Sequence, residues 1–334
     1  MKKLFKTLPL LMVASLSACD IAHQYPIDNL FCFDTVVTVK TTEYNGLMYS
    51  VHVQEGTCQR LKEIDAVADA YKKRDVACIY DLNNTNEEIE ISEQLYKLLK
   101  RALDAQTFAP YYNPFIGSLS NKWKEALSKG EILSESIIQE ELNKMKDAEL
   151  ILGWDGENKY TAQRVGEALI DVGAIAKGYA LDVCESYLHK HAEPEYEYMI
   201  DAGNSSILLG RNKGGSNFKI KIKDLSKPTY LYLKDCFIST SGTSEQGVKI
   251  GNNTYSHIIN PNDGSAINNY DAVIVIAPAQ GQMNGFKTDA LSTSLMLSSI
   301  EEIEYFDYGS DCSVIVIKDD NIVYSSESLE LYHG

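Results

Sequence analysis

The sequence predicts an α+β protein in which helices pack against a mainly antiparallel sheet, within one large domain that has a helical N-terminal portion. Apolar residues recur at helical spacing in the first half of the chain. The second half holds many short β-branched runs, whose short connections favour hairpins over crossovers. No G-x-G-x-x-G motif follows a predicted strand, and no G-x-x-x-x-G-K motif with a following Ser or Thr occurs. Rossmann and P-loop folds are therefore disfavoured.

Four segments of the first half have clear local patterns. Residues 33–42 are rich in Val and Thr and predict a strand. Residues 57–73 carry apolar side chains at helical spacing and predict a helix. A second helix should start after Ser92, whose hydroxyl suits the N-cap position. Ser136 and Gln139 have the spacing of a capping box, which predicts a third helix that runs to about residue 146.

Short strand-like runs dominate the second half, and helical patterns near residues 175–190 and 286–299 interrupt them. The predicted strands are residues 168–171, 198–201, 206–210, 218–224, 230–235, 237–240, 272–278 and 313–320. The run FKIKIKD at 218–224 alternates strictly between apolar and charged residues. We therefore expect it to form a half-buried strand of an antiparallel sheet.

The composition argues against a nucleic-acid-binding protein. Asp and Glu number 47 against 31 Lys and Arg, which gives a formal net charge of −16 over 334 residues. A surface that binds a duplex needs clustered Lys and Arg to neutralise phosphates. The sequence contains no such cluster.

The N-terminus has the features of a bacterial lipoprotein signal. Lys2, Lys3 and Lys6 precede a short apolar run that ends in small residues before Cys19. The run is too short to span a membrane as a stable helix. We therefore predict that residues 1–18 are removed and that Cys19 is lipidated; an ordinary secretory signal with a chance cysteine is the alternative.

This interpretation divides the chain into a signal peptide, a tether at residues 19–32 and a folded domain at residues 33–330. The signal holds three lysines and no acidic residue, so the mature chain carries a net charge of about −19. No later stretch contains 18 consecutive apolar residues. The predicted location is thus the extracytoplasmic face of the cell membrane, with the lipid as the anchor.

The other six cysteines are scattered and include no C-x-x-C pair, which disfavours a structural zinc site. They are Cys32, Cys58, Cys78, Cys184, Cys236 and Cys312. Six cysteines allow 15 disulfide connectivities, among which the sequence does not choose. Cys184 and Cys236 lie in apolar patterns, so we expect them in the core.

The most informative stretch runs from Asp171 to Ala180. Small residues follow a predicted strand and then open a helix, so the backbone can approach a ligand closely there. The N–H groups of a helix start favour an anion, and Lys177 adds a positive charge beside them. A tight turn with small packing residues explains the same pattern equally well.

Two further stretches carry polar side chains of catalytic type. Asp289 and Thr293 are four residues apart at the start of a predicted helix, so both face one side. One carboxylate and one hydroxyl suit Mg²⁺, which takes its other ligands from water and phosphates; helix capping is the structural alternative. His257 lies between an apolar strand and a Pro-Asn-Asp-Gly turn. It is a candidate general base, or else a histidine with a structural role.

Four ordered stretches together resemble the ApbE family of FAD:protein FMN transferases, many of which are lipoproteins. They are DVGAIAKGYALD at 171–182, ISTSGTSEQ at 238–246, YSHIINPNDG at 255–264 and TDALSTSLM at 288–296. Upstream, Phe33-Asp34-Thr35 stands where the family has Met-Gly-Thr, and residues 105–119 resemble its x-F-D-P-T-x-G-x-L segment. The resemblance covers about residues 33–300.

The resemblance implies a Mg²⁺-dependent enzyme that cleaves FAD, releases AMP and leaves FMN esterified to a Thr hydroxyl of an acceptor protein. The flavin contacts that it implies are Phe33, Tyr71, Tyr111, Tyr112, Asn113, Asp171, Lys177, His257 and Ile258. The metal ligands that it implies are the carbonyl of Ala174 and the side chains of Asp289 and Thr293. His257 is the candidate general base for the acceptor hydroxyl, and Asp289 is the second candidate catalytic residue.

The chain departs from the family pattern at several of these positions. Asn113 and Asn260 replace Asp, Ala174 stands where Gly is common, and Asn204-Ser205 stand where Gly-Asp is usual. A carbonyl ligand survives a change from Gly to Ala, but Asn supplies no charge. Two other functions therefore stay open: a Mg²⁺-dependent FAD pyrophosphatase that passes FMN to water, and a flavin-binding lipoprotein without catalysis.

Overall fold

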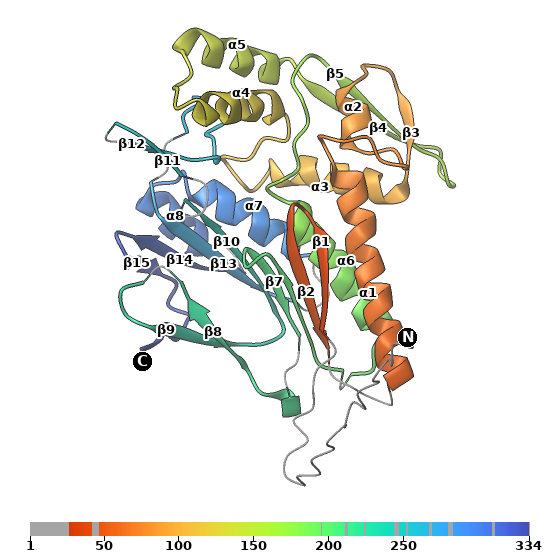
Figure 1. Cartoon of the computed structure of the whole chain (residues 1–334), viewed down its shortest axis with the longest axis vertical. Coiled ribbons are helices and arrows are strands. Elements are labelled where there is room, and N and C mark those ends of the chain that lie inside the picture. The colour runs from red at the N-terminus through yellow and green to blue at the C-terminus, as the bar shows by residue number, and fades with distance from the viewer. Residues whose placement is uncertain are drawn as a thin grey trace, which may run out of the picture.

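An eight-stranded antiparallel sheet forms the centre of the molecule (Figure 1). The computed structural model describes residues 27–41, 47–194, 196–210, 213–223, 225–243, 247–251, 253–266, 269–279, 283–308 and 311–333. The strand order is β1-β2-β6-β7-β10-β13-β14-β15. The bounds are β1 Ile27–Cys32, β2 Thr35–Thr41, β6 Tyr198–Ala202, β7 Ser206–Leu209, β10 Cys236–Gly242, β13 Ala272–Pro278, β14 Ser313–Lys318 and β15 Asn321–Ser325.

Three smaller sheets surround the central one. Their strands are ordered β3-β5-β4, β16-β9-β8 and β11-β12. The bounds are β3 Ile89–Ile91, β4 Glu149–Trp154, β5 Tyr160–Val165, β8 Phe218–Ile222, β9 Thr229–Leu233, β11 Val248–Ile250, β12 Asn253–Tyr255 and β16 Tyr332–His333. Every strand pair between described residues is antiparallel, which confirms the predicted α+β class.

Helices cover one face of the central sheet, and the β8–β9 hairpin covers part of the other (Figure 1). The helices are α1 Leu47–Ala68, α2 Ile79–Asn83, α3 Glu93–Ala105, α4 Gly117–Ser128, α5 Glu135–Lys146, α6 Ala176–His191, α7 Gly285–Leu295 and α8 Ile300–Tyr308, with a short 3₁₀ turn at Lys213–Gly215. Strand β10 shows why both faces are covered. Phe237 faces the helices, whereas its neighbours Cys236 and Ile238 belong to the core beneath the hairpin.

Several predicted elements are confirmed. The hydroxyl of Ser92 accepts the N–H of Leu95 at 3.2 Å and caps α3, as expected. The alternating run at 218–224 contains β8, which is half-buried and antiparallel to β9. The predicted helices near 175–190 and 286–299 are α6 and α7.

Other boundaries differ from the predictions. Helix α1 starts at Leu47, ten residues before the expected start at residue 57, and ends at Ala68. Helix α5 has Ser134 at its N-cap position, so the expected cap at Ser136 is wrong. Residues 27–32, which were assigned to the tether, form strand β1 and pair along their whole length with β2. A two-residue turn at Phe33 and Asp34, both with φ of 55°, joins these strands into a hairpin that the sequence analysis did not predict.

The strand predicted at residues 168–171 does not form. Side chains and a loop carbonyl bind the N–H groups of this segment, so they do not enter a sheet. Ser118 Oγ accepts from Leu169 at 2.9 Å and Asn83 Oδ1 accepts from Ile170 at 2.7 Å. The carbonyl of Pro114 accepts from Asp171 at 2.7 Å. The sequence pattern was apolar enough for a strand, but long-range partners replaced the ladder.

Cys32, Cys58, Cys78, Cys184 and Cys236 have free thiols, and Cys184 and Cys236 are buried as expected. No helix among the described residues is long and apolar enough to cross a membrane. Cys19 and the predicted signal lie outside the described residues.

Helices α6 and α7 cross with their backbones in direct contact. A Cβ at Gly178 would collide with the carbonyl oxygen of Gly285, and a Cβ at Gly285 would collide with that of Gly178. Each helix also caps the other. Asp182 of α6 accepts the N–H groups of Gly285 and Phe286 at 2.7 and 2.8 Å, whereas Asp289 of α7 accepts the N–H of Gly178 at 2.6 Å. The crossing therefore satisfies N–H groups that a helix start leaves unpaired.

The carboxyl group of Asp182 should contribute to the free energy of unfolding. Burial raises the pKa of Asp182, although the two N–H donors oppose this shift. Replacing Asp182 by Asn should lower the free energy of unfolding by about 1–3 kcal/mol, because the new NH₂ group faces a backbone N–H that then has no acceptor. Urea denaturation measures the loss.

Asp155→Asn is the matched control for this change. In that exposed turn a single carboxylate oxygen accepts both backbone N–H groups, from Glu157 and Lys159. The amide oxygen can do the same, so the change should cost less than about 0.5 kcal/mol. Equal losses for the two variants would contradict the capping role of Asp182.

Candidate active site

A cavity of about 850 Å³ lies between the central sheet, the β8 strand and the loops around the start of α6. It gathers most of the residues that the sequence analysis selected, from segments far apart in the chain. Those that line it are Phe33, Tyr111, Tyr112, Asn113, Asp171, Ala174, Lys177, His257, Ile258 and Thr293. Two predicted residues do not line it: Asp289 is buried, with 6% exposure, and Tyr71 is 54% exposed.

The start of α6 forms one wall of the cavity. Asp171 Oδ1 accepts the N–H of Gly173 at 2.7 Å, which folds the loop before the helix. Burial raises the pKa of Asp171. Part of the expected anion site is absent, because Ala176 donates its N–H to the carbonyl of Val172 and Gly178 donates to Asp289. Lys177 therefore supplies most of the positive charge at this wall.

The predicted metal ligands lie on α7 and on the loop before α6. Asp289 accepts hydrogen bonds from the N–H of Gly178 and from the hydroxyl of Ser206, both at 2.6 Å. The hydroxyl of Ser241 lies 3.1 Å from that of Thr293 and adds an oxygen donor that the sequence analysis missed. The sequence feature that could have identified Ser241 is its position in the ISTSGTSEQ stretch.

The predicted ligands provide a single carboxylate, so a cation that needs several protein carboxylates does not match them. No group of three or more His, Cys, Asp or Glu side chains among the described residues is arranged to hold a metal. Each carboxylate oxygen of Asp289 uses one of its two lone pairs in the hydrogen bonds above, so one remains on each. A cation that keeps water and binds substrate phosphates suits one carboxylate, one hydroxyl and one carbonyl.

His257 projects from the loop after β12 into the cavity, where its side chain is exposed. Partial enclosure of the ring by the cavity and the charge of Lys177 lower the pKa of His257. The backbone beside it is held firmly, since Ile258 donates its N–H to Ser256 Oγ at 2.9 Å. The turn that follows closes through the N–H of Gly264 and the carbonyl of Asn260 at 2.8 Å. The arrangement presents a neutral imidazole at neutral pH.

An aromatic wall faces the cavity from the loop between α3 and α4. The hydroxyl of Tyr112 is buried and has no hydrogen-bond partner among the described residues, and burial raises its pKa further above the usual range. Tyr111 donates its N–H to Ser294 Oγ at 3.0 Å, which ties the loop to α7. Tyr112 lines the cavity, and its buried hydroxyl is the kind of unsatisfied polar atom that native structures rarely leave without a partner.

The two Asn residues that replace the family's Asp both close turns. Asn113 Oδ1 accepts the N–H of Phe115 at 2.9 Å, and Asn260 Oδ1 accepts that of Asn262 at 2.9 Å. An amide oxygen performs this function as well as a carboxylate oxygen. The departures therefore preserve the loops that shape the cavity and remove only charge.

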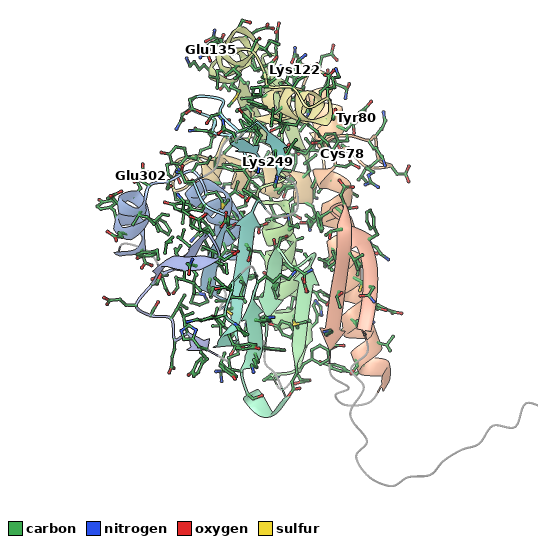
Figure 2. All side chains as sticks on the ribbon, turned by 60° about the vertical axis from the view of Figure 1, so that its left-hand side comes forward. Cys78, Tyr80, Lys122, Glu135, Lys249 and Glu302 are labelled. Carbon is green, nitrogen blue, oxygen red and sulfur yellow. The ribbon has the colours of Figure 1, made fainter. Side chains whose placement is uncertain are left out.

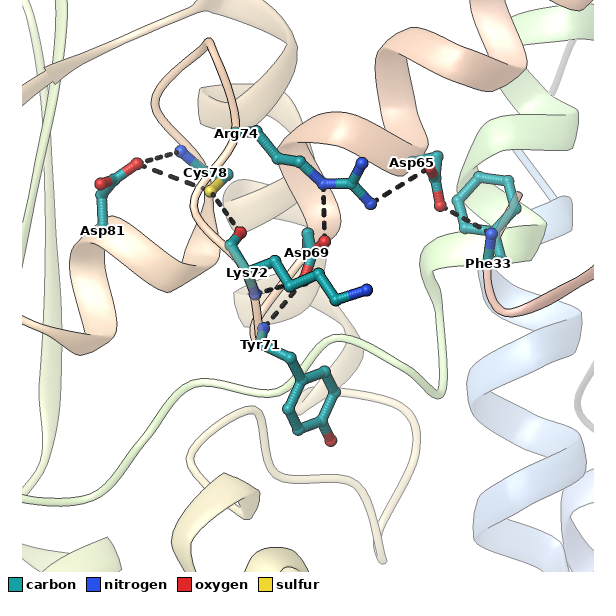
Figure 3. A network of polar contacts seen from close by, with 8 residues as sticks. All are labelled: Phe33, Asp65, Asp69, Tyr71, Lys72, Arg74, Cys78 and Asp81. Carbon is teal, nitrogen blue, oxygen red and sulfur yellow. Dashed lines mark hydrogen bonds and ion pairs between the residues drawn. The ribbon is translucent and has the colours of Figure 1, made fainter. Parts of the chain in front are cut away.

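A network of charged side chains, which the sequence analysis missed, links Phe33 and Tyr71 (Figure 3). Asp65 accepts the N–H of Phe33 at 2.6 Å, and its other oxygen lies 3.6 Å from a guanidinium nitrogen of Arg74. Arg74 donates its Nε–H to Asp69 at 2.6 Å, and Asp69 accepts the N–H groups of Tyr71 and Lys72 at 2.8 and 2.9 Å. In the sequence, an Asp at position 69 could have predicted this turn, because Asp side chains often accept the N–H two residues further on.

This network fixes the backbone of Tyr71. The side chain is 54% exposed, yet burial of its inner part and the nearby charges of Asp171, Asp34 and Asp69 raise the pKa of Tyr71 to about 12. Asp171 and Asp34 both line the cavity. Phe33 and Tyr71, 38 positions apart in the chain, are thereby fixed relative to one another.

The fold and the cavity define a ligand-binding α+β domain with aromatic walls, a lysine at a helix start and a neutral histidine. The profile of the ApbE family matches residues 33–314. The chain belongs to this family.

Individual relatives agree with the assignment. A FAD:protein FMN transferase of Vibrio cholerae is 24% identical over 275 residues, which cover 80% of this chain and 79% of the relative. The crystal structure of an ApbE protein of Thermotoga maritima has a TM-score of 0.75 at 22% identity, over 91% of this chain and 98% of the other. The flavin transferase ApbE of Vibrio cholerae has a TM-score of 0.71 over the same shares. The family, the fold and the transferase class predicted from the sequence are confirmed.

The lowered pKa of His257 should be visible in a titration. Its ring should titrate below the ordinary value of 6.5, and Lys177→Met should raise the midpoint because a nearby positive charge is removed. NMR of the ring protons measures both values.

The control is Lys40→Met, which removes a second lysine of the cavity wall and should leave the titration midpoint of His257 unchanged.

Since the folded-state pKa of His257 is below the unfolded one, the stability that the neutral ring contributes is present above pH 6.5 and is lost as the pH falls through the folded pKa. A midpoint at or above 6.5 in the wild type would contradict the assigned environment.

Proposed function

We propose that this chain is a Mg²⁺-dependent FAD:protein FMN transferase that attaches FMN to a Thr hydroxyl of an acceptor protein and releases AMP. The observation that carries the proposal is the cavity itself, which brings Lys177, His257 and Thr293 together with the aromatic side chains of Tyr111 and Tyr112. The names of the curated relatives support the same reaction.

In the proposed reaction the acceptor hydroxyl attacks the phosphorus of the FMN half of FAD. The oxygen of the new ester forms its bond to phosphorus as the bond to the AMP phosphate breaks, and AMP leaves with that electron pair. The neutral ring of His257 takes the proton of the hydroxyl. Lys177 lies on the same cavity wall and stabilises the negative charge of the two phosphates.

Magnesium would be held by the carbonyl of Ala174 and the side chains of Asp289 and Thr293. When bound, it supplies positive charge to the pyrophosphate. Asp289 is already oriented by its hydrogen bonds to Gly178 and Ser206, so little freedom is lost when it binds a cation. Phe33, Tyr71 and Tyr111 supply aromatic surface for the flavin ring at the opening.

One incubation distinguishes the transferase from its two alternatives. The chain is mixed with FAD, Mg²⁺ and a candidate acceptor protein, and both products are analysed by mass spectrometry. Transfer yields AMP and an acceptor whose mass rises by one FMN. Free FMN and AMP with unchanged acceptor indicate a pyrophosphatase, and intact FAD indicates a binding protein.

Asp289→Asn tests the metal assignment, and the geometry makes it a clean change. The amide oxygen can accept from Gly178, while the NH₂ group can donate to the hydroxyl of Ser206, so both hydrogen bonds survive. Stability should change by less than about 1 kcal/mol. The transfer rate should fall by orders of magnitude, because the metal loses its one side-chain charge. Raised Mg²⁺ should restore only part of the rate.

Thr293→Val is the companion variant. Its hydroxyl is a neutral ligand that water can replace, so the loss of rate should be much smaller than for Asp289→Asn. Rates are compared at limiting Mg²⁺ by the release of AMP. A near-wild-type rate for Asp289→Asn under these conditions would contradict the assignment of Asp289 as a metal ligand.

We also propose that the chain is anchored through lipid on Cys19 at the extracytoplasmic face of the membrane, as its N-terminal residues suggest. Cys19→Ser should abolish lipidation and release the protein from the membrane fraction. Fractionation followed by immunoblotting measures the distribution. Membrane association that persists in this variant would exclude the lipid as the anchor.

A further inference from the structure

Strand β8 has a free edge that opens into the cavity. In the β16-β9-β8 sheet it is the outer strand, and β9 is its only sheet partner among the described residues. Residues 218–223, the whole of β8 and the residue after it, line the cavity. An edge strand offers N–H and C=O groups to another extended chain. A segment that entered the cavity along β8 could therefore add a strand to this sheet.

The groove beside β8 has an apolar wall and a positively charged rim. Phe218, Ile220 and Ile222 pack towards the central sheet, whereas Lys219 and Lys221 are exposed on the opposite face of the strand. Lys219 Nζ lies 4.0 Å from the ring centre of Tyr230 on β9, so its charge is held over the hairpin. Across the groove the cavity wall is formed by Lys40, Met199 and Ile207.

The charges of the cavity lining differ in sign from those of the chain. Among the described residues its lysines are Lys40, Lys177, Lys219, Lys221 and Lys223, and its aspartates are Asp34, Asp171 and Asp201. The whole chain, in contrast, has a net charge of −16. All the lysines except Lys177 belong to β8, the residue after it, or the facing strand β2. A local excess of positive charge in an acidic protein selects an acidic partner.

We propose that the free edge of β8 binds an extended, acidic segment of the acceptor protein as an added strand. This inference rests on the proposed transferase function and names how its protein substrate is recognised. Five residues of β8 span about 17 Å, enough to hold a short peptide in register. The groove is continuous with the part of the cavity that Lys177, His257 and Thr293 line, so a bound segment leads its hydroxyl towards them.

The geometry also predicts the pattern of the bound segment. Alternate side chains of a strand point to opposite faces. One set would lie against the apolar wall at Met199 and Ile207, and the other would lie beside Lys219 and Lys221. Alternating apolar and acidic residues therefore complement this edge. A free flavin nucleotide carries no backbone N–H and C=O groups and does not match the edge of a strand.

Peptide binding tests the proposal without requiring catalysis. The probe is a fluorescein-labelled peptide in which Asp and Val alternate around a central Thr, and the comparison peptide has Lys in place of Asp. Fluorescence anisotropy with the full chain should give a dissociation constant at least about ten times lower for the acidic peptide. Raised salt should weaken its binding.

Lys219→Glu combined with Lys221→Glu should reverse this preference, and Lys219→Gln with Lys221→Gln should abolish it. Both side chains are exposed, so the neutral pair tests the charge with little effect on folding. Lys122→Glu is the matched control. It is an exposed lysine on α4, at the opposite end of the molecule from β8 (Figures 1 and 2), and should leave the preference unchanged.

The outcomes separate this inference from the proposed function. Equal binding of the two peptides by the wild type, or the same preference in both double variants, overturns the docking site on β8. Protection of the β8 amides from hydrogen exchange by the acidic peptide supports it, and unchanged exchange rates contradict it. Failure of the wild type to transfer FMN to any acceptor, with the peptide preference intact, overturns the transferase function instead.

Discussion

The reciprocal capping between α6 and α7 is the interaction on which the rest of the site depends. Gly178 and Gly285 let the two helix backbones touch, and each helix supplies a carboxylate to the start of the other. Helix α7 also lies on β10 and β13, so the crossing is fixed to the central sheet. As a result Lys177 and Thr293, 116 positions apart in the chain, line the same cavity. Without this contact the N–H groups of Gly178, Gly285 and Phe286 would lose their acceptors.

The sequence was informative wherever the chemistry is local. The i, i+4 spacing of Asp289 and Thr293 correctly placed both residues on one helix. The small residues of the stretch around Lys177 predicted a close backbone approach, and Gly178 makes such an approach to Gly285 of α7. The sequence was uninformative wherever a residue acts on a distant one. Asp182 reads as an ordinary helical residue, because its partners at the start of α7 lie more than 100 positions away. The contact of Asp65 with Phe33, 32 positions away, was missed for the same reason. Residues 168–171 do not form the predicted strand because long-range partners accept their N–H groups.

Charged and apolar side chains are unevenly distributed around the cavity. The part of the cavity near the start of α6 combines aromatic side chains with single charged residues, whereas the β8 part combines apolar side chains with lysines. Local positive charge costs little in a chain of net charge −16, because the surrounding excess of acidic groups stabilises each lysine. The same acidic surface repels anionic partners elsewhere, so it helps to confine an acidic segment to the groove.

Asp289 connects stability with chemistry in a single carboxylate. Two of its four lone-pair sites are used by Gly178 and Ser206, which hold it in position whether or not a cation is bound. A metal bound there gains an oriented ligand but receives only the two remaining sites. Its affinity must then depend on the phosphates of the substrate, which supply the charge that the protein does not. A sparse donor set and a buried, doubly hydrogen-bonded aspartate are therefore two aspects of one arrangement. The cation and the pyrophosphate should bind together more tightly than either does alone.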